Sequence, residues 1–120
     1  MVDKKVLLAY GLANKDLNIL KTFNKEYIIV KDNMTGTKIE NLINEVEILP
    51  SEKSIPKEKI ILINGYSNKE VDILIKIIRG AMGKRVIIAV ITENSNSWTF
   101  DYLATEHLIK ERDWYKKNNK

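Results

Sequence analysis

The sequence predicts an internally duplicated α/β protein in which both halves read β-α-β-α and share one sheet. The phrase VLLAYGLANKDLNILK, from residue 6, returns as IILINGYSNKEVDILI from residue 60. Each copy is followed by a short run rich in β-branched residues and then by a segment with helical spacing. Both prolines of the chain lie between the two copies, which marks a linker there.

The repeat aligns at an offset of 54 residues, which places Gly11 on Gly65. The match runs through an apolar run, a glycine turn and a helix start, so it spans different kinds of structure. A chance similarity between two strands would not extend so far.

The first strand of each half is predicted on the apolar runs 6–9 and 60–63, and these strands end at Tyr10-Gly11 and at Asn64-Gly65. The runs YIIV (27–30) and VIIAVI (86–91) are β-rich and bounded by polar residues, which is typical of buried strands.

A helix is predicted after every strand. Ser67 with Glu70, and Thr37 with Glu40, have the spacing of a capping box, and Ser97 is the expected N-cap of the last helix.

The strands are apolar along their length and need cover on both faces, and a half of this size is marginal alone. We therefore expect a three-layer α/β/α sandwich with four parallel strands, Rossmann-like, in the order 2-1-3-4. An alternative joins the halves around a twofold axis normal to the sheet, which makes the central strand pair antiparallel.

Residues 1–120 are expected to form one domain. It consists of two repeats (about 4–46 and 58–112), a linker (47–57) and a basic tail (113–120). No apolar run approaches the ~18–20 residues of a membrane helix, and the N-terminal apolar run is shorter than a signal-peptide core. We therefore expect a cytoplasmic protein without membrane contact. The chain has no cysteine, which excludes disulfides, thiolate nucleophiles and zinc ribbons.

The net charge of +4 is a weak indication of nucleic-acid binding. The last five residues, KKNNK, supply three of the positive charges, and only three of the 20 basic residues are arginine. Bidentate contacts to phosphate or guanine favour arginine, so this composition argues against nucleic acid as the partner.

The site is expected beyond the carboxyl ends of the strands, where open parallel sheets bind ligands. The outer strands also end there, at Asp32-Asn33 and at the run 92–98. Trp98 follows the expected N-cap directly, where it would either stack on a ligand or cover the end of the sheet. The candidate ligand-binding residues are Tyr10, Gly11, Asn64, Gly65, Thr92, Asn94, Asn96 and Trp98.

No catalytic, metal-binding or cofactor-binding residue is predicted. The sequence has neither G-x-G-x-x-G after its first strand nor a P-loop, and GAMGKR (80–85) follows a helix and lacks the hydroxyl residue. His107 is the only histidine, and without a second His or a Cys it is a poor metal ligand.

The stretches INGYSNKEVDILIKIIR and TENSNSWTFDYLATEHLIKE resemble a bacterial family of uncharacterised proteins, the domain-of-unknown-function family 3783. The matching features are Gly65 at the end of its strand, Thr92 after the next strand, and Trp98, Leu103 and Glu106 in the last helix. The resemblance covers the C-terminal half and implies a fold but no activity.

We therefore expect a small, non-enzymatic cytoplasmic module, monomeric or homodimeric, that binds a partner protein or a regulatory small molecule. The alternative is a protein or enzyme that binds a nucleotide or another small polar ligand in the strand-end crevice.

Overall fold

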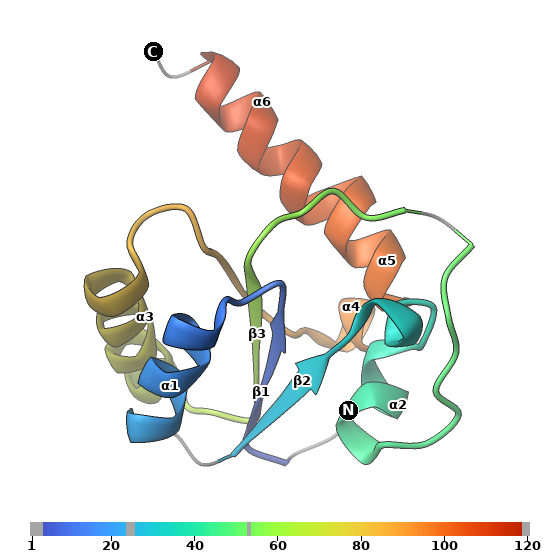
Figure 1. The fold of residues 1–120 in the computed structure, drawn as a ribbon, viewed down its shortest axis with the longest axis horizontal. Helices are drawn as coiled ribbons and strands as arrows, with labels where there is room; N and C mark the ends of the chain where they lie inside the picture. The colour runs from blue at the N-terminus through green and yellow to red at the C-terminus, as the bar shows by residue number, and fades with distance from the viewer. Residues whose placement is uncertain (1–3, 24–25, 53, 119–120) are drawn as a thin grey trace.

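The sheet has four strands in the order β2-β1-β3-β4, with helices on both faces (Figure 1). The computed structural model describes residues 4–23, 26–52 and 54–118. The strands are β1 (Val6–Tyr10), β2 (Tyr27–Val30), β3 (Ile60–Asn64) and β4 (Ile87–Val90). The predicted mixed α/β fold and strand order are confirmed.

The central strand pair is antiparallel, so the prediction of four parallel strands is wrong at this pair. Strands β1 and β2 are parallel, as are β3 and β4, but β3 runs opposite to β1. The segment before β3 returns to the carboxyl end of β1, where Gly11 lies against the backbone of Glu58. Strand β3 starts there and must run back along β1, which is the alternative that the sequence left open.

The register of the central pair follows the sequence repeat. Leu8 lies opposite Leu62, its counterpart at the 54-residue offset, and Val6 opposite Asn64. Two ion pairs also correspond at this offset, Lys59 with Asp16 (2.7 Å) and Lys5 with Glu70 (3.0 Å). The two ion pairs therefore join residues that correspond to one another in the sequence repeat.

The helices form two layers. Helices α1 (Asn14–Phe23) and α3 (Asn68–Met82) cover one face of the sheet. The other face carries η1 (Asp32–Met34), α2 (Ile39–Asn44), α4 (Glu93–Asn96), α5 (Phe100–Tyr102), the π-helical turn η2 (Leu103–Ile109) and α6 (Lys110–Asn118).

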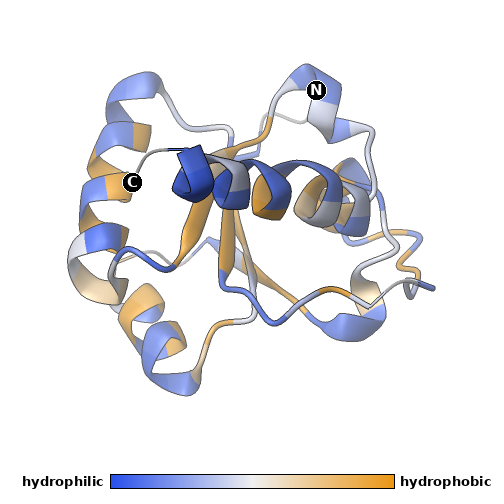
Figure 2. Ribbon diagram, turned by 90° about the horizontal axis from the view of Figure 1, so that it is seen from above, coloured by the Kyte–Doolittle hydropathy of each residue, from blue (hydrophilic) through white to orange (hydrophobic). Residues whose placement is uncertain are grey.

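The core fills both interfaces between the sheet and its helices, because strand side chains alternate between the faces. Leu7 and Ala9 of β1 pack toward α1 and α3, whereas Val6, Leu8 and Tyr10 pack toward the other helices. Figure 2 shows the hydrophobic colour on the strands and the hydrophilic colour on the outer sides of the helices.

One of the two predicted capping boxes forms. The Ser67 hydroxyl accepts from the Glu70 N–H (3.2 Å), and the Glu70 carboxylate accepts from the Ser67 N–H (3.0 Å). Thr37 does not cap a helix, because Lys38 precedes α2 and the Thr37 hydroxyl accepts from the Leu49 N–H (2.7 Å).

The predicted N-cap Ser97 is wrong. Thr92 caps α4 and Ser97 ends it, while Thr99 precedes α5. Thr99 forms an isolated antiparallel bridge with Lys38, and the Ile39 N–H donates to the Trp98 carbonyl (2.8 Å).

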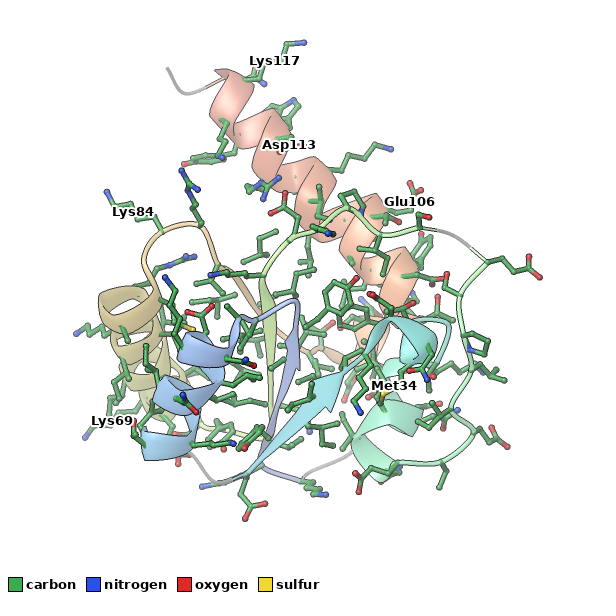
Figure 3. All side chains as sticks on the ribbon, viewed as in Figure 1. Met34, Lys69, Lys84, Glu106, Asp113 and Lys117 are labelled. Carbon is green, nitrogen blue, oxygen red and sulfur yellow. The ribbon has the colours of Figure 1, made fainter. Side chains whose placement is uncertain are left out.

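Helix α6 extends beyond the rest of the molecule (Figure 1), so the expected basic tail is helical through Asn118. No residue of α6 is buried, and Asp113 and Lys117 reach into solvent (Figure 3). Trp114 and Tyr115 are 63% and 65% exposed, so this aromatic pair is not buried against the domain. None of the described helices combines the length and the apolar character needed to cross a bilayer.

Candidate functional site

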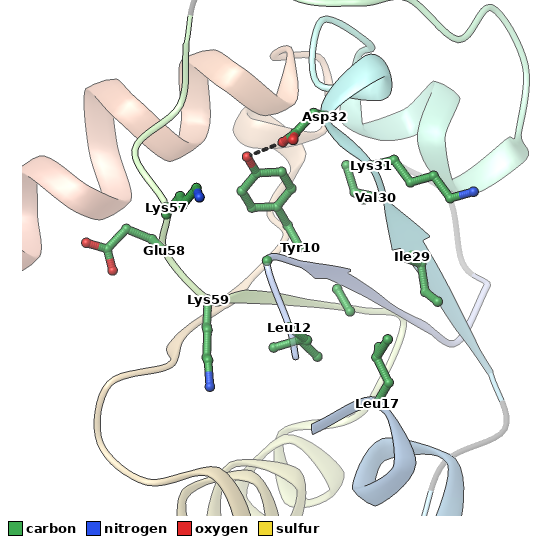
Figure 4. Close-up of a pocket in the computed structure, with 12 residues that line it drawn as sticks. Tyr10, Leu12, Leu17, Ile29, Val30, Lys31, Asp32, Lys57, Glu58 and Lys59 are labelled. Atoms are coloured by element: carbon green, nitrogen blue, oxygen red, sulfur yellow. Dashed lines mark hydrogen bonds between the residues drawn. The ribbon is translucent and has the colours of Figure 1, made fainter. Parts of the chain in front are cut away.

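A cavity of about 580 Å³ opens where the parallel strands β1 and β2 end (Figure 4). Its walls come from the end of β1 and the first turn of α1, from the end of β2, and from the segment that leads into β3. The lining residues are Ala9, Tyr10, Gly11, Leu12, Leu17, Ile29, Val30, Lys31, Asp32, Lys57, Glu58 and Lys59.

The backbone shapes this cavity at Gly11. Gly11 has a φ of 73°, in the region that favours glycine, and a Cβ there would overlap the Glu58 carbonyl oxygen. Its glycine therefore lets the segment 57–59 pass close to the end of β1 and form one wall.

A hydrogen-bonded pair of side chains lies at one end of the cavity. Tyr10, the last residue of β1, donates from its hydroxyl to Oδ1 of Asp32 at the end of β2 (2.7 Å; Figure 4). The Tyr10 ring is fixed by Phe100, whose ring centroid lies 5.2 Å away. Burial, and then the hydrogen bond and charge of Asp32, raise the pKa of Tyr10 to about 12. Tyr10 is therefore a neutral hydrogen-bond donor at physiological pH.

A second carboxylate lies behind the α1 wall. Asp16 is only 2% exposed, accepts from the Ala13 N–H (3.2 Å) and forms an ion pair with Lys59 (2.7 Å). Burial acts to raise the pKa of Asp16, but the hydrogen bonds from Lys59 and the Ala13 N–H outweigh it and hold this pKa below its usual value. The first turn of α1 thus carries a built-in, neutralised anion.

The remaining wall is tied to α6. Arg112 donates two hydrogen bonds to the Glu58 carboxylate (2.6 and 2.8 Å), and these bonds hold the pKa of Glu58 below its usual value. In Figure 4 the Glu58 side chain points away from the Tyr10 ring. Its carboxylate therefore anchors the wall instead of facing a ligand.

Of the predicted ligand-binding residues, Tyr10 and Gly11 line this cavity. Asn64 and Gly65 lie at the opposite end of the sheet, because β3 runs against β1. The Asn64 amide donates to the Lys4 carbonyl (2.8 Å). The predicted crevice between all four strand ends does not form.

The other candidates belong to the β4 end. Thr92 exchanges hydrogen bonds with Ser95, and the buried Asn96 amide donates to Glu40 (3.2 Å), while Asn94 is exposed. These contacts shape the turns that follow β4.

Trp98 packs against the core and against two other rings. Its indole stacks on His107 (centroids 4.5 Å apart) and meets Tyr102 edge-on (5.2 Å). Tyr102 and His107 are five residues apart, and the π-helical turn η2 brings this spacing onto one face. Trp98 does not line the cavity.

The sequence reasoning missed two parts of the site. The first part is the segment 57–59, which lay in or beside the predicted linker. In the antiparallel alternative this segment reaches the carboxyl end of β1, so its three charged residues directly before a buried strand could have indicated a wall of the site. Asp16 aligns with Glu70 in the repeat, and the predicted cap at Glu70 was the available signal for a carboxylate in the first turn of α1.

A metal site is not apparent, since the described residues include no group of three or more His, Asp or Glu side chains suited to hold an ion.

Comparison with known proteins gives one match. Residues 59–115 match the family model of a domain of unknown function, DUF3783. No curated protein and no solved structure matched the chain. The matched range runs from the start of β3 into α6, so β1, β2 and nearly all of the cavity lining lie outside it.

Proposed function

We propose that the protein is a non-enzymatic module that binds a regulatory small molecule in the cavity at the ends of β1 and β2. Residues 59–115 match DUF3783, a family of unknown function, so the proposal rests on the chain's own physical features.

The observation that carries this proposal is the cavity itself. Its volume of about 580 Å³ is in the ~300–1,000 Å³ range of small-molecule sites. Apolar side chains of Leu12, Leu17 and Ile29 supply contact area, while Tyr10 and Asp32 supply hydrogen bonds that orient a ligand. Adjacent parallel strands end here, which is where α/β sheets place their ligands.

The polar groups of the lining favour binding over catalysis. The high pKa of Tyr10 keeps its hydroxyl protonated, which makes it a weak nucleophile. The Lys59 ammonium is held by Asp16, and the Glu58 carboxylate by Arg112. Among the described lining residues, these three groups are therefore not poised for proton transfer or attack.

The test is native mass spectrometry of the full chain, purified gently and without dialysis. The wild type should carry an excess mass of the size of a small metabolite. Leu17→Trp should lose it, because the larger ring fills the cavity. Ile73→Trp, on the exposed face of α3, is the matched control and should keep it. A clean wild-type mass, or an excess that Leu17→Trp retains, contradicts the proposal.

We also propose that the two halves descend from one duplicated β-α-β-α unit of Rossmann-like type. The central register, the corresponding ion pairs and a family match that covers one half support this. A bacterial, cytoplasmic origin belongs to the same proposal, supported by the cysteine-free composition and the resemblance to a bacterial family.

A further inference from the structure

We infer that the ligand of the cavity is a ribonucleoside without a phosphate group. This inference rests on the proposed function and names its ligand class. It follows from two carboxylates, Asp32 in the lining of the cavity and the buried Asp16 behind its α1 wall.

The position that would hold a phosphate is already occupied. Phosphates bind at helix N-termini because free N–H groups and the helix dipole favour an anion there. In α1 the carboxylate of Asp16 takes this place, bonded to the Ala13 N–H and neutralised by Lys59. A phosphate at α1 would find the Ala13 N–H already bonded and the Lys59 ammonium already paired with Asp16, so these two donors are not available to it.

The lining of the cavity offers an acceptor for hydroxyl groups. Asp32 stands at the end of β2 and 21 residues after Gly11, where an acidic residue in dinucleotide-binding folds accepts from the ribose. Tyr10 holds Oδ1 and so fixes the carboxylate, while Oδ2 has no hydrogen-bond partner among the described residues. The exposed Asp32 can therefore accept from the ribose diol.

The middle of the cavity is apolar. Leu12, Leu17 and Ile29 line it (Figure 4), and their aliphatic side chains give a flat base an apolar surface to contact. A base in this position would have its sugar at Asp32.

The lysines do not restore a phosphate site. Lys59 is committed to Asp16, and Figure 4 shows Lys31 extending away from the Tyr10 ring. Lys31 and Lys57 are exposed, so their attraction for anions is weak and screened by salt.

The test is calorimetric titration of the full chain at about 150 mM salt, where exposed charges are screened. The probes are adenosine, guanosine, cytidine and uridine, with their 5′-monophosphates and 2′-deoxy analogues. At least one ribonucleoside should bind. Its monophosphate and its deoxy analogue should each bind at least about tenfold more weakly, a difference of about 1.4 kcal/mol.

Two variants separate the roles of the carboxylates. Asp32→Asn should weaken the nucleoside by at least about tenfold, whereas Asp72→Asn, exposed on α3, is the control and should change nothing. Asp16→Asn should narrow the difference in affinity between the nucleoside and its monophosphate, because Lys59 is released from its ion pair with Asp16. If Asp16→Asn fails to fold, the affinity of the nucleoside for Asp32→Asn, a substitution at an exposed residue, tests the inference by itself.

A monophosphate that binds as tightly as its nucleoside would overturn the inference, as would equal binding by Asp32→Asn. If no nucleoside binds while the mass excess is lost in Leu17→Trp, the ligand class is wrong and the proposed function stands. If the mass excess is also absent, both are wrong.

Discussion

At Gly11 a single missing side chain determines whether the cavity wall can form. Gly11→Ala places a Cβ against the Glu58 carbonyl at a positive φ, and we expect the free energy of unfolding to fall by about 1–3 kcal/mol. Gly80→Ala is the control, because Gly80 is helical and open, and it should raise this free energy by roughly 0.5–1 kcal/mol. Urea denaturation followed by circular dichroism measures both. Equal effects of the two substitutions would contradict the close approach at Gly11.

Tyr10 should make the protein less stable in alkali. In the unfolded chain its phenol ionises near its ordinary pKa of 10.0, whereas in the folded chain it stays protonated up to about pH 12. Between these values the unfolded state binds fewer protons, so the unfolding free energy falls as pH rises. Tyr10→Phe should lose less stability than wild type over this interval in urea denaturation. The same loss in both proteins would show that Tyr10 is not the group responsible.

At the scale of the element, the π-helical turn η2 determines how the Trp98 side chain packs. Its π-helical spacing stacks His107 on the indole, and Trp98 packs against the hydrophobic core. Trp98→Ala should therefore lower the unfolding free energy by about 1–3 kcal/mol and leave the ligand mass excess unchanged. Loss of the bound ligand without a loss of stability would contradict this and would support the alternative that Trp98 stacks on a ligand.

Local patterns predicted elements best where the contacts are themselves local. The cap at Ser67 is made by Glu70, three residues away, and both are visible in the sequence. Thr37 has the same spacing but is drawn into an extended pairing: its carbonyl accepts from the Phe100 N–H (2.9 Å). A contact across that sequence distance leaves no local signature.

Across the whole molecule, the strands and their order could be predicted, but the direction of β3 could not. A strand buried on both faces is apolar throughout, so either direction buries the same side chains. Because β3 runs opposite to β1, Gly65 lies far from Gly11. Asn64 and Thr92 lie at the end of the sheet away from the cavity. The cavity lies where the parallel neighbours β1 and β2 end: Tyr10 is the last residue of β1, and Asp32 follows β2 closely.

The shared centre of the sheet predicts that the two halves unfold together. Strands β1 and β3 pair along their whole length, so neither half keeps a core after the other unfolds. Circular dichroism reports both halves, and fluorescence reports the second, which holds both Trp98 and Trp114. The two urea transitions should coincide. Separate midpoints would mean that the halves are independent.

The most direct test of ligand binding at this cavity is a fragment screen of the isotope-labelled chain by ¹H–¹⁵N correlation spectroscopy, using small aromatic fragments that carry hydroxyl groups. The account predicts that binding fragments shift the amides of Leu12, Leu17 and Ile29, and that Leu17→Trp loses these shifts while Ile73→Trp keeps them. Binding that shifts other surfaces instead, or that persists in Leu17→Trp, would contradict it.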